Sequence, residues 1–313
     1  MRNKISSSLP QEFAERAEAL NGTAFAAFQT ELAAANHRRL EPCLPADASA
    51  ASFDTEQQVA RAECRYLAAV RREIAPLVGD IPTDVDAFIA WFEDLTTSGP
   101  GQGDPLFPWL ATAATIDELR WFLTQEVAGE AGFEDLLAMT QVKFPQQAKL
   151  EMARNFWDEM GRGHPGGMHG PMLDRLSAYL GVEPVPERVV PESLALANAM
   201  LAMASHRSFA FHSIGAMGVI EMTAPGRAAL VNEGLKRVGV PTRKRQYFAV
   251  HAILDVKHSE SWNREVLRPL VAEDPRRAEA IGEGAIIRLW HGARCFERYR
   301  RELFGTVVHD AAA

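Results

Sequence analysis

The run Tyr247-Phe-Ala-Val-His251-Ala-Ile-Leu-Asp255-Val-Lys-His258 carries three side chains of the kinds that bind metal ions. At about 100° per residue in a helix, Asp255 lies about 40° from His251, and His258 returns to within about 20° of it two turns on. Two imidazoles and one carboxylate therefore share one face of a predicted helix.

The apolar residues Ile253 and Leu254 in the same run predict that this helix is buried. Three ionisable groups are costly there unless a cation or a polar partner satisfies them. A lone His or Asp on an apolar face is usually a hydrogen-bonded core residue. Three such residues on the same helix face favour a metal site more strongly, because each buried polar group left unpaired costs roughly 1–3 kcal/mol. The helix alone leaves both interpretations open.

Composition excludes several classes of protein. The 313 residues carry 33 Lys and Arg against 41 Asp and Glu, a net charge of −8, so no positive field attracts nucleic acid. The first ten residues lack the apolar core of a signal peptide, and no stretch approaches the roughly 18 apolar residues of a membrane span. We expect a cytoplasmic protein that binds neither nucleic acid nor membrane.

Helical spacing of apolar residues dominates the chain, and alternating strand patterns are missing, so the fold class is predicted to be all-α. Thr115-Ile-Asp-Glu118 has the form of a capping box at a helix start. The helices are expected at residues 11–39, 56–75, 85–94, 116–127, 147–160, 172–180, 191–204, 224–238, 243–259 and 275–303.

The longest interruption of this pattern is the Gly/Pro-rich loop at residues 96–105. We take it as the boundary between an N-terminal helical extension, residues 1–105, and the main helical bundle, residues 106–313. An extension of this kind often forms a dimer surface or a lid, so a homodimer is among the expected assemblies.

A cation bound by two His and one Asp commonly needs further ligands from other helices. Glu126 is one candidate, because it shares a helix face with Leu119 and Phe122. Glu221 is another, because it ends a Gly-rich apolar stretch where an unpaired charge would be costly.

The segment Asn155-Phe-Trp-Asp-Glu159-Met-Gly-Arg-Gly-His164-Pro-Gly-Gly-Met-His169 offers two more ligands. Adjacent carboxylates lie about 100° apart, so only one faces inward. Glu159 is the better choice, while Asp158 is expected to pair with a base. His169 leads an apolar helix and is preferred over His164, although the sequence leaves both open. The candidate set is Glu126, Glu159, His169, Glu221, His251, Asp255 and His258, which suits two metal ions better than one.

The order and spacing of these residues resemble the haem-oxygenase-like di-iron oxidases and oxygenases, in particular the iron-containing redox enzyme family. The motifs that carry the resemblance are Asp158-Glu159 with its Gly-rich turn and His, and His251-x3-Asp255-x2-His258. The resemblance covers residues from about 116 to 303 and leaves residues 1–105 outside.

The resemblance implies a haem-oxygenase-like (TenA-like) seven-helix bundle that binds two Fe(II) ions and uses O2 as co-substrate. It implies a non-haem di-iron oxidoreductase acting on a small-molecule substrate in natural-product biosynthesis, with an external electron donor as a further partner. Of the substrates, a small aliphatic amino acid is expected first, for desaturation, C–H or C–N oxidation, cyclisation or cleavage.

The alternatives are a fatty-acid oxidative decarboxylase or an N-oxygenase of the same superfamily, a metal-free TenA-like enzyme, and a non-catalytic helical binding protein. A polar substrate needs a cationic anchor for its carboxylate. Arg294, Arg298 and Lys257 lie on helices that could supply one.

Overall fold

The computed structural model describes residues 9–10, 12–45, 50–130, 132–185 and 188–305. Within these ranges every regular element is helical, apart from one isolated bridge between Met160 and Met168. The prediction of an all-α fold is therefore confirmed. No helix in the described part of the chain is long and apolar enough to cross a membrane.

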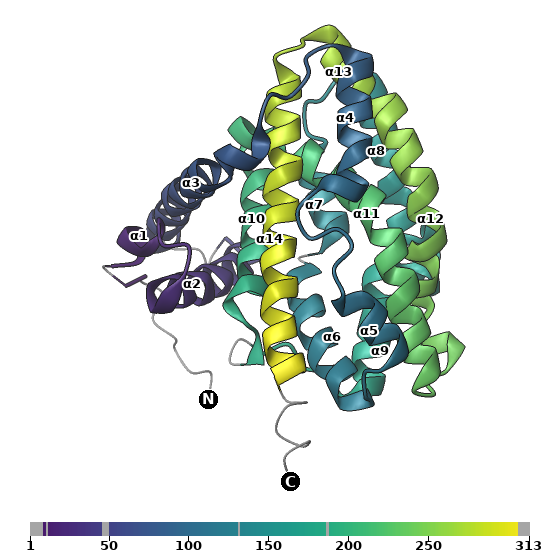
Figure 1. Cartoon of the computed structure of the whole chain (residues 1–313). Coiled ribbons are helices and arrows are strands. Elements are labelled where there is room, and N and C mark those ends of the chain that lie inside the picture. Colours follow the sequence, from purple (N-terminus) through teal and green to yellow (C-terminus); the bar gives the residue numbers. More distant parts are fainter. Residues whose placement is uncertain (1–8, 11, 46–49, 131, 186–187, 306–313) are drawn as a thin grey trace.

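Three long helices form the centre of the bundle. Helix α11 (Ala210–Arg237) packs against α14 (Arg277–Gly305) on one side and against α12 (Gln246–Trp262) on the other. In Figure 1, α14 runs the length of the molecule beside α10 (Pro191–Ser205). A π-helical segment (Asn263–Leu267) continues α12 into α13 (Arg268–Glu273).

Shorter helices complete the bundle around these three. They are α4 (Val85–Ser98), α5 (Leu106–Thr112), α6 (Ile116–Glu130), α7 (Phe133–Thr140), α8 (Gln146–Glu159) and α9 (His169–Leu180). The start of α6 confirms the capping box: Glu118 accepts the backbone N–H of Thr115 at 2.7 Å, and Thr115 Oγ1 accepts that of Glu118 at 3.3 Å.

The first three helices lie together at one side of the bundle in Figure 1: α1 (Phe13–Arg16), α2 (Gly22–Leu40) and α3 (Ala50–Val78). Helix α2 is joined to α10 by buried hydrogen bonds, in which Asn36 donates to Asn198 at 3.1 Å and Asn198 donates to Gln29 at 2.9 Å. Helix α4 instead packs on α11 and α13. Division of the chain near residue 105 stays a prediction.

Most expected helices differ from the observed ones by a few residues at their ends, and two differ more. The helix expected at residues 11–39 is divided into α1 and α2 by the extended backbone of Asn21 and the positive φ of Gly22. The helix expected at residues 224–238 is the second half of α11, which continues through Pro225. Proline removes one backbone donor there, but packing on both α12 and α14 holds the helix together.

Helices α11 and α14 approach so closely that glycine is required at their contact. A Cβ atom on Gly215 would overlap the carbonyl oxygen of Ile281, and one on Gly284 would overlap the backbone of His212. A Cβ on Gly218 would lie 2.6 Å from Nε1 of Trp262, which ends α12. These glycines let both neighbours pack directly on the α11 backbone.

We expect Gly215→Ala to lower the free energy of unfolding by about 1–3 kcal/mol, because the new methyl group forces α11 and α14 apart. The matched control is Gly226→Ala on the same helix, where a Cβ would meet nothing within 4 Å. That change should raise the free energy of unfolding by about 0.5–1 kcal/mol, because alanine favours a helix interior. Urea denaturation of the two variants measures both effects, and equal stabilities would contradict the close approach.

Candidate metal centre

The turn between α8 and α9 brings the end of one helix to the start of the next. Gly161 and Arg162 both have a positive φ, and a Cβ on Gly161 would overlap the backbone of Gly167. The chain thereby reverses within a few residues, so that Nδ1 of His169 lies 2.8 Å from Oε2 of Glu159. His164 is exposed in this turn and lies away from the cluster. The geometry therefore places His169 beside Glu159.

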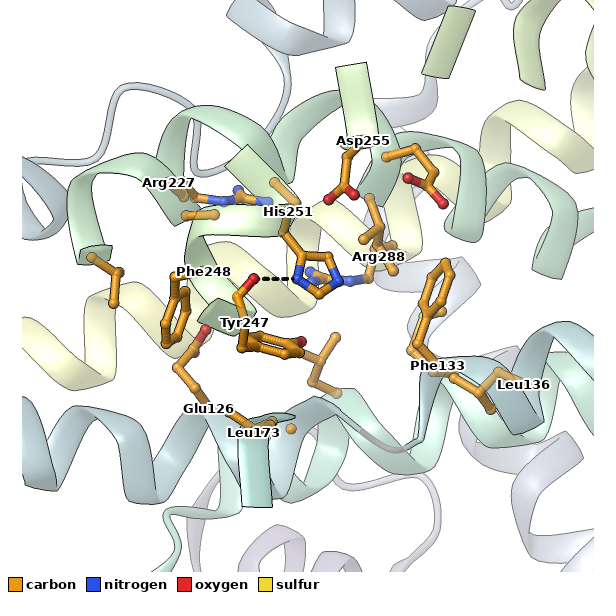
Figure 2. Close-up of a pocket in the computed structure, with 18 of the residues that line it drawn as sticks. Glu126, Phe133, Leu136, Leu173, Arg227, Tyr247, Phe248, His251, Asp255 and Arg288 are labelled. Carbon is orange, nitrogen blue, oxygen red and sulfur yellow. Dashed lines mark hydrogen bonds between the residues drawn. The ribbon is translucent and has the colours of Figure 1, made fainter. Parts of the chain in front are cut away.

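Glu159, His169 and His251 form a first group of candidate ligands. Each offers one atom, and the three atoms lie within 4.8 Å of one another. Nδ1 of His251 donates to the carbonyl oxygen of Tyr247 at 2.7 Å, as the dashed line in Figure 2 shows. This bond fixes the tautomer of His251 and leaves its Nε2, 3.1 Å from Nδ1 of His169, available to bind a metal.

Glu221, Asp255 and His258 form a second group, all buried and again with ligand atoms within 4.8 Å of one another. Two side chains of α8 support it from outside. Nε2 of His258 donates to Asp158 at 3.1 Å, and the Asn155 amide donates to Glu221 at 2.6 Å. Asp158 also accepts from Arg162 at 2.5 Å, so the prediction that it pairs with a base is confirmed.

The donor set fits two divalent cations. Three carboxylates and three imidazoles come together in the two groups, and among the described residues no arginine or lysine forms an ion pair with any of these three carboxylates. Oδ1 of Asp255 is buried without a hydrogen-bond partner, and Nδ1 of His258, also buried, lies 3.4 Å from Oε2 of Glu221 without a hydrogen bond. Unsatisfied ligand atoms in a dry, acidic cluster are costly, and metal ions bound there would remove that cost.

The pKa values in the cluster reflect the same lack of positive charge. Burial, together with Glu221 and Glu159, raises the pKa of Asp255 to about 9, and burial raises that of Glu159 to about 8. Burial alone would lower the pKa of His258, but Glu221 and Asp158 outweigh it and raise this pKa to about 9. The polypeptide by itself therefore holds extra protons, which bound metal ions would replace.

Helix α12 is less buried than its sequence predicts. Ile253 is 71 % exposed, so the interpretation of this residue as a sign of a buried helix is wrong. Ile253 lies about 200° from His251 and thus on the opposite face. Only the face with Asp255 and His258 points into the bundle, where both are buried.

Glu126 lies apart from the two groups, although it lines the same cavity as Glu159, Glu221, His251 and Asp255. The cavity has a volume of about 160 Å³. Glu126 accepts a hydrogen bond from Tyr299 and faces the charges of Arg227 and Arg288, all three of which the sequence interpretation missed. The sequence does contain a sign that Arg288 is unusual, because this charged residue interrupts the apolar run from Ala285 to Trp290. The role of Glu126 as a metal ligand stays a prediction.

Glu134, at the start of α7, was also missed. Its carboxylate acts electrostatically on Glu159 and His169, and a Cβ on Gly170 would lie 3.0 Å from its Oε1. It therefore stands at the edge of the first group. The sequence signal for Glu134 was an acid followed by apolar residues at helical spacing. This signal is weak, because acids in the first turn of a helix usually only stabilise the helix end.

None of the three expected anchors lines this cavity. Arg294 donates to the carbonyl oxygen of Leu20 and stacks on Trp290, and Arg298 pairs with Glu302 at 2.7 Å. Lys257 borders a separate surface hollow on the outer side of α12. Helices α12 and α14, which carry these residues, do line the cavity, but none of the three side chains lies among its lining residues.

Comparison with known families agrees with this geometry. Residues 120–293 match the model of the family described as iron-containing redox enzyme. The match covers more than half of the chain and includes all seven candidate ligands, so the chain belongs to this family, as its motifs predict. The fold is the all-α, haem-oxygenase-like bundle. No curated protein matches the chain.

We expect chelator-treated protein to lose stability as pH rises from about 4 to about 9. The pKa values of Asp255 and Glu159 are raised by folding, so the stability they contribute is complete below their unfolded values near 4 and is lost as pH rises through about 8 to 9. The raised pKa of His258 acts in the same direction between about 6.5 and 9. Thermal denaturation of wild type and Asp255→Asn across this pH range measures the effect.

The Asp255→Asn variant should show the shallower decline, because asparagine does not ionise. Asp174→Asn on α9, outside both groups, is the control and should follow wild type. A wild-type stability that rises with pH over this range would contradict the charge balance described for the cluster.

Proposed function

We propose that this protein is a non-haem di-iron oxidoreductase that uses O2 to oxidise a small aliphatic substrate, most simply an amino acid. The observation that carries the proposal is the pair of three-residue ligand groups, Glu159 with His169 and His251, and Glu221 with Asp255 and His258. Their three carboxylates would offset most of the charge of two Fe(II) ions. Membership of an iron-containing redox family supports iron as the metal.

Iron bound there would supply the electrons and open coordination positions that O2 chemistry requires. The protein contributes the arrangement. Asp158 orients His258, the Tyr247 carbonyl orients His251, and Asn155 holds Glu221. These contacts would hold each side chain in the orientation needed to bind a metal, before any metal is present.

The cavity beside the two groups supports a small substrate. Its volume of about 160 Å³ is close to that of an engineered cavity that holds benzene, roughly 150 Å³. Leu196, Met200 and Ile220 give it apolar walls that exclude water. A fatty-acid chain is disfavoured by this volume, and a metal-free enzyme or a binding protein is disfavoured by the buried, unpaired Oδ1 of Asp255 within the acidic cluster.

Desaturation illustrates the electron balance of the proposed reaction. Reduction of O2 to two waters takes four electrons, of which a carbon–carbon single bond converted to a double bond supplies two. The other two come from an external electron donor, which is part of the proposal. In oxidative cleavage or cyclisation at the same centre, the substrate would supply a different number of the four electrons.

Anaerobic titration with Fe(II) should show about two ions bound per chain. Glu159→Gln and Glu221→Gln should each lose about one of them, because each removes a charged ligand from a different group. The control is Glu260→Gln, an exposed residue at the end of α12. Iron bound per chain, measured after desalting, decides the result. Binding of no iron by wild type would overturn the proposal.

Adding O2 to the iron-loaded protein should give a transient visible absorption band, whose formation depends on the substrate present. We expect five- to seven-carbon aliphatic amino acids to accelerate it over substrate-free protein, and decanoate to leave it unchanged, because the cavity is small. Stopped-flow absorption measures both. Acceleration by decanoate alone would favour the fatty-acid alternative.

A further inference from the structure

The cavity beside the metal ligands also contains positively charged side chains. Arg227 of α11, Arg288 of α14 and Glu126 of α6 line it together with His251 and the rest of the ligand groups. In Figure 2, Arg227 and Asp255 lie on opposite sides of His251. The two arginines thus share one cavity with the acidic cluster but belong to neither ligand group.

Arg288 has no fixed partner. Among the described residues, the structure records neither a hydrogen bond nor an ion pair for its guanidinium, which acts only electrostatically on Cys295, Glu126 and Tyr299. Burial lowers its pKa. Gly292, one turn on, leaves room for the side chain, since a Cβ there would lie 2.9 Å from Nη1 of Arg288. A guanidinium with five donors therefore borders the cavity without an acceptor.

Arg227 is held in place by contacts that do not neutralise it. Its guanidinium lies over the rings of Phe107 and Phe296, at 5.8 and 5.4 Å from their centres, and donates to Oγ1 of Thr223 at 2.8 Å. Cation–π contacts and one hydroxyl leave most of its donors free. Burial lowers its pKa to about 9.

Glu126 does not cancel these charges. It is within the electrostatic reach of both arginines, but no ion pair of 4.0 Å or less joins it to either among the described residues. Its recorded hydrogen bond comes from Tyr299. Outside the two ligand groups, two guanidiniums and one carboxylate leave an excess positive charge around Glu126, an arrangement that an anion would stabilise.

We propose that Arg227 and Arg288 bind the carboxylate of the substrate and that Glu126 receives its α-ammonium group, so that the substrate is an aliphatic α-amino acid. The inference rests on the proposed function and specifies its substrate class. Planar guanidiniums suit a carboxylate. Arg227 follows Glu221 by six residues, about 9 Å along the helix axis. The aliphatic chain would lie along Leu196, Met200 and Ile220 toward the ligand groups.

Isothermal titration calorimetry tests the subsite with norleucine, hexanoate and norleucine amide, on the chain as isolated and after anaerobic Fe(II) loading. Norleucine should bind at least ~10-fold more tightly than hexanoate, and the amide at least ~10-fold more weakly than norleucine, because each probe lacks one charged group. Binding of the amide as tight as that of norleucine, or absence of norleucine binding in both preparations, would overturn the proposal.

Two variants assign the roles. Arg288→Gln should weaken norleucine and hexanoate alike by at least ~10-fold, whereas Glu126→Gln should weaken norleucine to the level of hexanoate and leave the iron content unchanged. Arg298→Gln on the same helix, whose side chain pairs with Glu302, is the control and should bind as wild type. Loss of iron from Glu126→Gln would make this residue a metal ligand and overturn the amino-group assignment.

Stability and iron binding separate the possible failures. Arg288→Gln should unfold at a denaturant concentration no lower than wild type, since it removes an unpaired buried charge; a marked loss of stability would indicate a structural role and overturn the proposal. If iron binds as expected but norleucine does not, the subsite fails and the proposed function stands. If norleucine binds as expected but iron does not, the proposed function fails and the subsite stands.

Discussion

The structure depends on a buried excess of negative charge at the meeting point of α8, α9, α11 and α12. Glu159, Glu221 and Asp255 lie there with exposures of 2–4 %, in a place where three ionised carboxylates repel one another and lack water. Burial first, and repulsion from the neighbouring carboxylates second, raise the pKa values of Asp255 and Glu159. Cations or protons must therefore accompany the folded state.

The rest of the bundle keeps these acids at a fixed separation. Glycines at positions 215 and 284 bring α11 against α14, and Gly218 brings it against Trp262 at the end of α12. Glu221, on α11, is thereby set relative to Asp255 and His258 on α12 by close packing of Gly218 against the Trp262 ring. The π-helical segment after Trp262 redirects the chain into α13 just beyond the ligand helix, a feature often found near functional sites.

Residues on one helix could be predicted from the sequence, since the spacing of His251, Asp255 and His258 alone places them on one face. The choice of His169 over His164 depends on a turn with left-handed backbone at Gly161 and Arg162, which no periodicity reveals. The neighbours of Glu126 depend on how α6 packs against α11 and α14. Arg227 and Arg288 could not be paired with it from sequence, because they lie 101 and 162 positions further along the chain.

The separation of the two arginines from the acidic groups is itself a requirement of a metal centre. A guanidinium bonded to Glu221 or Asp255 would satisfy the carboxylate and compete with a cation for it. Phe107, Phe296 and Thr223 restrain Arg227 on its own side of the cavity. The cavity thus holds two guanidiniums that are not paired with the acidic ligand groups. These charges would orient a substrate that carries its own charge at one end and an aliphatic chain at the other.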